Sequence, residues 1–174
     1  MSISILFQVL PDDLERRVKT ALQALRDGNI TDIEAASFFF NYFFQRLEPM
    51  YRNNPKAAQV IQESVKQQEI GLIVPNLVEV TLHIKTISEL SFTKGVNPKS
   101  PAMIFNALQV VEDILLAKTT LSQALIENKI KIKKMANILR WLAPIATIQT
   151  EAILQQVREE DLAILEKNLQ KIGY

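Results

Sequence analysis

His83 is the one histidine of the chain and the side chain best suited to proton transfer near neutral pH. Glu79 precedes it by four residues, so on a helix the carboxylate and the imidazole would share a face as an acid–base pair. Such pairs arise by chance in many helices, and a surface histidine on a polar face is the favoured interpretation. A metal site would need further ligands, and the sequence has no Glu-x-x-His pair of the di-iron bundle type.

Other signatures of catalysis or cofactor binding are missing from the sequence. The acidic groups 12–13, 112–113 and 159–161 consist of neighbours that point apart on a helix, whereas paired-carboxylate hydrolysis needs two acids facing one cleft. The glycines are too far apart for a phosphate-binding loop, and there is no Gly-x-Ser-x-Gly turn. The chain has no cysteine, which excludes thiol catalysis, zinc–thiolate sites and iron–sulfur clusters. We therefore expect no enzyme, no cofactor and no metal.

The most unusual segment is residues 38–44, which holds six of the chain's twelve aromatic residues. With helical spacing, Phe40, Phe43 and Phe44 share the core-facing side, while Phe38 and Tyr42 lie on the opposite side and Phe39 lies between. An exposed aromatic surface of this kind marks a binding site for a partner. The favoured alternative is that a neighbouring helix of the same chain covers these side chains. We predict Phe38, Phe39 and Tyr42 as partner-binding residues.

A second unusual segment spans residues 128–142 and is predicted as a basic amphipathic helix. Lys129, Lys133 and Arg140 lie opposite its apolar stripe, with Lys134 to one side, and no acidic residue occurs from 128 to 150. Such a helix can bind nucleic acid or an anionic membrane surface. The favoured alternative is a solvated surface helix. Nucleic-acid binding is not favoured, because the net charge of the whole chain is only +1.

Composition indicates a globular chain of 174 residues, of which 48% are hydrophobic and 22% charged. Four glycines are few for an all-β or a dinucleotide-binding fold, whose turns consume glycine. The first ten residues carry no positive charge before their apolar stretch, so we expect no signal peptide. Uncharged runs are far shorter than a membrane span, which predicts a cytoplasmic protein without transmembrane segments.

Helix signals occur along most of the chain. Glu34 follows Thr31 at the spacing of a capping box, and Asn54–Pro55 is typical of a helix start. The residues near the start of the last helix are acidic and those near its end are basic, as the helix dipole favours. The predicted helices cover roughly residues 12–28, 31–48, 54–71, 100–127, 128–142, 145–158 and 159–172.

Residues 76–91 are ambiguous. Leu77, Val80, Ile84 and Ile87 follow helical spacing, but the residues from 78 to 85 also alternate as a strand would. A strand would need a partner, for which we considered only residues 2–10, so a helix is preferred.

The expected fold is therefore all-α: an irregular bundle of about seven helices, with a minor two-stranded element from residues 2–10 and 77–87 as the alternative. We predict a single domain over 1–174; loop 92–99 is the one place that would divide it into lobes 1–91 and 100–174. The expected function is a non-enzymatic interaction or regulatory role. It would act through association with a protein partner or with further copies of the chain.

Overall fold

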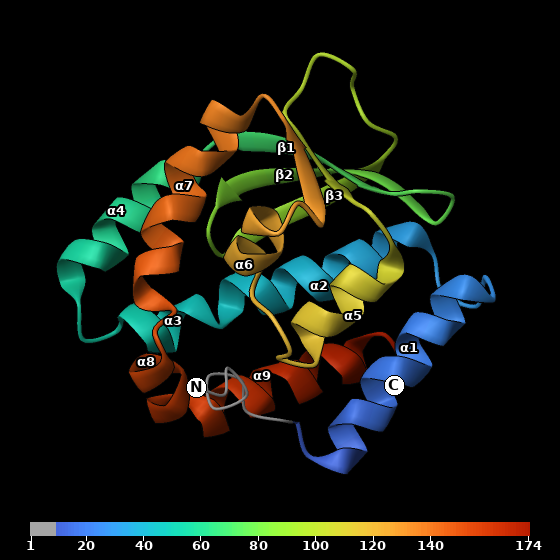
Figure 1. Ribbon diagram of the computed structural model, residues 1–174, viewed down its shortest axis with the longest axis horizontal. Coiled ribbons are helices and arrows are strands. Elements are labelled where there is room, and N and C mark those ends of the chain that lie inside the picture. Colours follow the sequence, from blue (N-terminus) through green and yellow to red (C-terminus); the bar gives the residue numbers. More distant parts are fainter. Residues whose placement is uncertain (1–9) are drawn as a thin grey trace.

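The computed structural model describes residues 10–174, and within them the chain forms nine helices and a five-stranded sheet (Figure 1). The helices are α1 (Asp12–Arg26), α2 (Asp32–Gln45), α3 (Leu47–Tyr51), α4 (Pro55–Val65), α5 (Leu108–Leu115), α6 (Leu121–Ile126), α7 (Met135–Ile148), α8 (Glu151–Gln156) and α9 (Arg158–Lys171). The strands are β1 (Gln68–Val74), β2 (Val78–Thr86), β3 (Glu89–Lys94), β4 (Ala102–Phe105) and β5 (Ile130–Lys133).

The sheet has the strand order β3-β2-β1-β4-β5. Antiparallel pairing joins β1 to β2, β2 to β3 and β4 to β5, whereas β1 and β4 are parallel. The strands β4 and β5 follow the 95–101 connection, and β1, β2 and β3 precede it. The parallel pairing of β1 with β4 joins both groups in one sheet. Strands from both of the lobes considered above are therefore hydrogen-bonded to one another.

Gly71 marks the centre of the sheet, where it pairs with Thr81 on β2 and with Ala102 on β4. A Cβ atom at this position would lie 2.4 Å from Cγ1 of Val96, in the loop that crosses the sheet here. Because that distance is far below van der Waals contact, only glycine lets Val96 approach the strand so closely.

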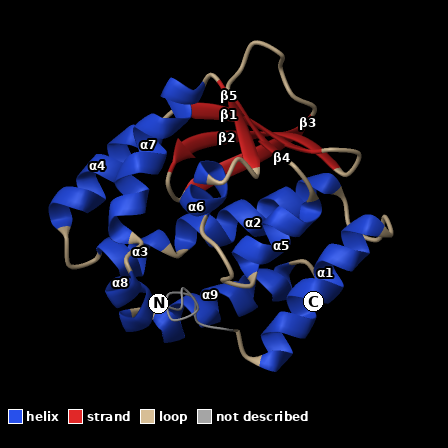
Figure 2. Ribbon diagram, in the orientation of Figure 1, coloured by secondary structure: helices blue, strands red, loops and turns tan. Residues whose placement is uncertain are grey.

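Alternation along the strands gives the sheet one apolar and one largely polar face. Helices gather on one side of the sheet, and α2 runs along it (Figure 2). On β1 and β2, these side chains of the apolar face are buried: Ile70, Leu72, Val74, Val80, Leu82 and Ile84. The opposite face carries polar groups such as Glu69 and His83.

The expectation of an all-α bundle is wrong, because five segments pair as strands. Residues 76–91 are not a helix but the strand β2 and the start of β3. The β-branched residues at 78, 80 and 84 fit a pleated strand, and the partners of β2 are β1 and β3. Residues 1–9, considered above as its partner, lie outside the described residues.

Two predicted long helices are also wrong. The segment 100–127 divides into β4, α5 and α6. The segment 128–142 is not one basic helix, because Ile130 and Ile132 alternate with lysines on β5 before α7 begins at Met135. Short apolar or alternating runs of this kind satisfy both helical and strand patterns, and pairing between β4 and β5 decides in favour of strands.

The helix that ends the described chain, α9, packs against α1 and α2 (Figure 1). Arg17 on α1 donates to the Tyr174 carbonyl oxygen at 3.0 Å and forms an ion pair with Glu166 at 3.0 Å. Leu165 and Leu169 of α9 are fully buried. The C-terminal helix is thus part of the packed core and forms one wall around α2.

None of the helices between residues 10 and 174 combines the length and the apolar composition that a membrane crossing requires.

Candidate functional site

The start of α2 is fixed by the predicted capping box. The Thr31 hydroxyl accepts from the Glu34 amide at 3.1 Å, and the Thr31 amide donates to the Glu34 carboxylate at 2.7 Å. The two interactions satisfy backbone donors that a helix start otherwise leaves unpaired. They set where α2 begins, and so which faces its aromatic residues occupy.

The predicted partner-binding residues Phe38, Phe39 and Tyr42 are all buried, with 4%, 5% and 5% of their surface exposed. Phe39 meets Phe40 at a ring separation of 4.8 Å and Phe105 of β4 at 5.9 Å, both edge to face. The chain itself therefore covers these side chains, but strand β4 contributes to the cover of Phe39, where the alternative interpretation expected a neighbouring helix. That they anchor a protein partner stays a prediction, and it would require α2 to be uncovered.

An apolar cavity of about 40 Å³ lies where α1, α2 and α5 meet the sheet. Phe38 and Phe39 line it, so two of the three predicted residues are brought together here. All the side chains that line the cavity are alanine, valine, leucine or phenylalanine: Leu22, Leu25, Ala35, Ala36, Phe38, Phe39, Phe40, Leu72, Val74, Val78, Phe105, Leu108, Val111 and Leu115. Such a cavity has no polar partner for water and favours hydrocarbon.

A polar cluster, in which Tyr42 is buried and Arg46 and Asp161 are partly buried, lies about one helical turn further along α2. The Tyr42 hydroxyl donates to Asp161 Oδ1 on α9 at 3.0 Å, and Arg46 Nη2 donates to Asp161 Oδ2 at 2.8 Å. The Arg46 guanidinium carbon lies 5.0 Å from the centre of the Tyr42 ring. Both oxygens of Asp161 are therefore occupied, and the cluster ties α2 to α9.

Burial dominates the acid–base behaviour of this cluster. It raises the pKa of the Tyr42 phenol well above its ordinary value, and Asp161 raises it further, while Arg46 opposes both. Burial alone lowers the pKa of Arg46, but Tyr42 and Asp161 more than offset this, so the net direction is upward. At neutral pH the Tyr42 phenol is therefore uncharged beside the guanidinium of Arg46.

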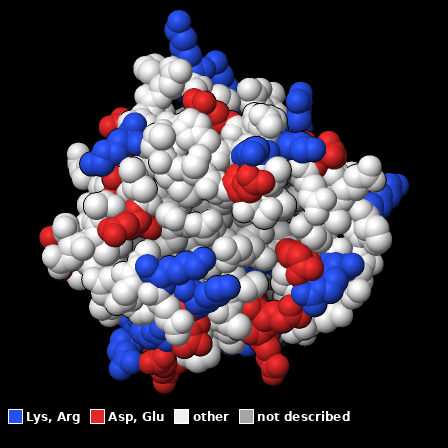
Figure 3. Space-filling view, turned by 180° about the vertical axis from the view of Figure 1, so that it is seen from behind, with Lys and Arg blue, Asp and Glu red and all other residues white. Residues whose placement is uncertain are grey.

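The predicted anion-binding residues do not share one helix face. Lys133 is on β5 and Arg140 on α7, both exposed. Lys129 pairs with Glu127 at 2.8 Å, and the Lys134 ammonium donates to the Lys99 carbonyl oxygen. Figure 3 shows that on the face it views, basic and acidic side chains are interspersed and do not form a field of one sign. Anion binding by these four residues stays a prediction.

His83 lies on the polar face of the sheet, where its Nε2 is 2.9 Å from the Thr93 hydroxyl and its Nδ1 is 3.6 Å from Glu69. The suggested pair with Glu79 depends on a helix. On strand β2 four residues span about 13 Å, so the two side chains are far apart. The group around His83 lies on an open strand surface, outside the cavities described here, and residues 10–174 contain no cluster of three metal-ligating side chains.

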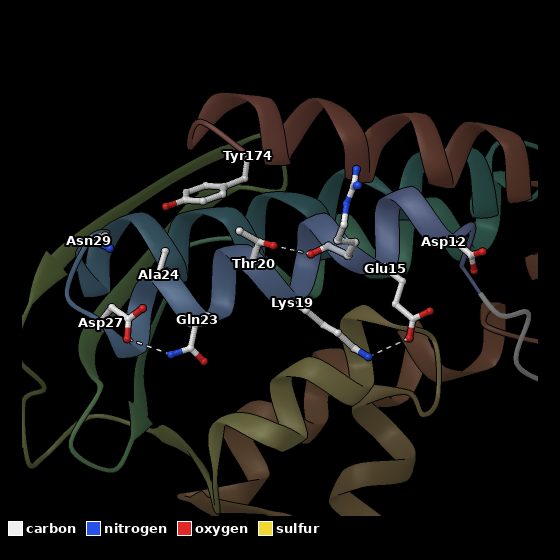
Figure 4. A pocket seen from close by; sticks show the side chains of 10 residues that line it. Asp12, Glu15, Lys19, Thr20, Gln23, Ala24, Asp27, Asn29 and Tyr174 are labelled. Carbon is white, nitrogen blue, oxygen red and sulfur yellow. Dashed lines mark hydrogen bonds and ion pairs between the residues drawn. The ribbon is translucent and has the colours of Figure 1, made fainter.

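A broad surface depression runs along α1 to Tyr174 (Figure 4). Four of its charged and polar groups are paired: Lys19 with Glu15 at 3.2 Å, and Gln23, which donates to Asp27 at 3.0 Å. The pairing follows the i, i+4 spacing of an exposed helix face. We therefore treat this depression as ordinary surface.

Sequence reasoning missed Arg46, Asp161 and the apolar cavity. Tyr42 and Arg46 are four residues apart, which places both on one helix face. Asp161, however, is 115 residues from Arg46, and no local sequence pattern connects these two residues. In the sequence alone, the residues that line the cavity cannot be told apart from ordinary core residues.

No protein-family model matches this chain, and no curated protein matches it either.

Proposed function

We propose that this chain is a non-catalytic binding protein for an apolar small molecule, which it holds between α2 and the sheet. The observation that carries the proposal is the cavity lined only by hydrocarbon side chains. Ligand sites are concave and mostly apolar, and they lie where secondary-structure layers meet.

The cavity is too small for a whole ligand as it stands, since pockets for small molecules usually measure about 300–1,000 Å³. A void of about 40 Å³ costs roughly 1 kcal/mol at about 24 cal/mol per Å³. An apolar ligand recovers this cost when α5 or α1 moves outward to admit it. These are the walls we expect to move, because neither helix start has a side-chain cap whereas α2 has a complete capping box.

Ala36 offers a direct test, because its side chain lines the cavity and is buried. Ala36→Val adds two methyl groups where the ligand would lie. Ala136→Val is the matched control: it adds the same two groups and the same β-branching to an exposed position on α7. Val111→Ala on the α5 wall enlarges the cavity.

The assay is titration with N-phenyl-1-naphthylamine, a neutral apolar dye whose emission rises when it leaves water. We expect the unmodified chain to bind the dye and Ala36→Val to lose about tenfold in affinity, or about 1.4 kcal/mol. Ala136→Val should bind as the unmodified chain does, and Val111→Ala should bind more tightly. The proposal fails if the unmodified chain does not bind the dye, or if the two valine variants behave alike.

Our proposed location for this activity is the cytoplasm, since a chain without cysteine needs no oxidising compartment to fold.

A further inference from the structure

A second pocket, of about 50 Å³, lies beside the polar cluster of Tyr42, Arg46 and Asp161. One part of its wall is polar and includes Tyr42, Arg46 and Asp161. Another part is apolar and includes Phe43 of α2 and Ile114 of α5. A pocket with one charged side and one hydrocarbon side suits the junction between the head and the tail of an amphiphilic molecule.

Arg46, which lines this pocket, has an unused hydrogen-bond donor. Its Nε is buried and has no hydrogen-bond partner, one of only two such side-chain atoms among residues 10–174; the other is Nε1 of Trp141. An unpaired buried N–H costs about 1–3 kcal/mol, so its retention calls for an explanation. A purely structural ion pair with Asp161 explains the Nη2 bond but not the idle Nε. Arginine grips a carboxylate best with two parallel N–H groups, and Nε is one of those that can serve.

The pocket also adjoins the apolar cavity. Phe43 lines the pocket, Phe40 lines the cavity, and their rings touch at a centroid distance of 6.2 Å. Helix α5 contributes to both as well, through Ile114 and its neighbour Leu115. The two spaces thus lie next to each other along α2, one lined by its residues up to Phe40 and the other by residues from Tyr42 onward.

We infer that the Arg46 pocket holds the carboxylate head group of the same ligand whose apolar part fills the cavity between α2 and the sheet. This inference rests on the proposed function and narrows its ligand to an amphiphilic monocarboxylate.

The test compares ligands that differ only in the head group. Dodecanoate and 1-dodecanol each compete with the neutral dye for the unmodified chain at pH 8. We expect dodecanoate to bind at least tenfold more tightly than dodecanol. Equal affinities would overturn the inference and leave the proposed function standing, whereas failure of the dye and of both competitors to bind would refute the proposed function itself.

Two double variants test whether the Arg46 pocket causes the preference for dodecanoate over dodecanol. Arg46→Gln with Asp161→Asn removes both charges together, because removing one alone would leave an unpaired buried charge. The matched control is Arg52→Gln with Glu160→Gln, which removes an exposed ion pair of 2.8 Å that also joins α9 to the α3 region. We expect the first pair to weaken dodecanoate alone by tenfold or more, and the control pair to change neither ligand. Full retention of the preference in the first pair would show that the cluster is only a structural tie.

A readout that needs no variant covers the case in which the first pair fails to fold. Dodecanoate labelled with ¹³C at the carboxyl group is titrated while bound to the unmodified chain. We expect the pKa of the bound acid to lie below that of the free acid, because the pocket is lined by the guanidinium groups of Arg46 and Arg158, which outweigh the opposing carboxylate of Asp161. A bound acid that titrates at or above the free value would overturn the inference.

Discussion

Replacing Tyr42 with phenylalanine tests how the chain uses its most unusual segment. The substitution keeps the buried ring and removes only the hydroxyl that donates to Asp161 at 3.0 Å. If Tyr42 were an exposed anchor for a partner, loss of the hydroxyl would leave the stability of the isolated chain unchanged. In this structure Tyr42 is 5% exposed, so the cost should appear as lost stability of the chain itself.

The size of the effect follows from the bond that is lost. A hydrogen bond to a charged group contributes about 1.5–3 kcal/mol to stability. Asp161 keeps its bond to Arg46 and its side chain is 17% exposed, so water can replace part of the loss. We therefore expect Tyr42→Phe to cost about 1.5–2 kcal/mol, which lowers Tm by about 3–8 °C in a chain of this size.

The pH dependence gives a second, independent signature. The pKa of Tyr42 is raised in the folded chain, first by burial and then by Asp161. The stabilisation linked to a raised pKa is fully present below the unfolded value of about 10 and is lost as the pH rises from there towards the folded pKa. The stability advantage of the unmodified chain over Tyr42→Phe should therefore shrink as the pH rises above about 10.

The assay is urea unfolding of both chains, followed by the emission of Trp141, which is fully buried and lies 5.8 Å from Phe44. Tyr42→Phe should lower the midpoint without changing the slope. Equal midpoints at pH 7 would refute the reasoning, because they would mean that the hydroxyl has no buried partner. A stability gap that grows at alkaline pH would refute the assigned direction of the pKa.

Two further predictions concern the scaffold. Gly71→Ala should destabilise the chain by about 1–3 kcal/mol because the new Cβ would overlap Val96, and Val96→Ala should recover part of the loss when combined with it; additive melting temperatures would contradict the proposed clash. Thr31→Ala removes one half of the capping box and should cost about 1 kcal/mol, measured by thermal unfolding, while Thr20→Ala, on the exposed face of α1, should change little; equal effects of the two would refute the role of the cap.

The parts of the fold that sequence predicted are those specified locally. Thr31 with Glu34 and Asn54 with Pro55 mark helix starts through side chains within one turn, and both starts are confirmed. The acidic start and basic end of α9 are local in the same sense. For these elements the neighbouring residues alone carry enough information.

The sheet could not be derived in this way because its pairing is not local. Ala102–Phe105 is a run of four apolar residues that suits a helix or a buried strand equally, and its parallel partner β1 lies some thirty residues earlier. The alternation of Ile130 and Ile132 with lysines was the available strand signal, but it is too short to outweigh the helical spacing that follows. The candidate site depends on the same long-range packing, since Asp161 meets Tyr42 only in the folded chain.

The contact between α2 and α9 can form only late in the synthesis of the chain. Asp161 follows Tyr42 by 119 residues, which at about 5–20 residues per second is roughly 6–24 s of synthesis. During that interval the ribosome has released the aromatic segment 38–44 but not yet α9, which supplies part of its cover. The growing chain therefore exposes part of an aggregation-prone aromatic segment for many seconds. We expect it to need a chaperone that shields this segment until α9 emerges.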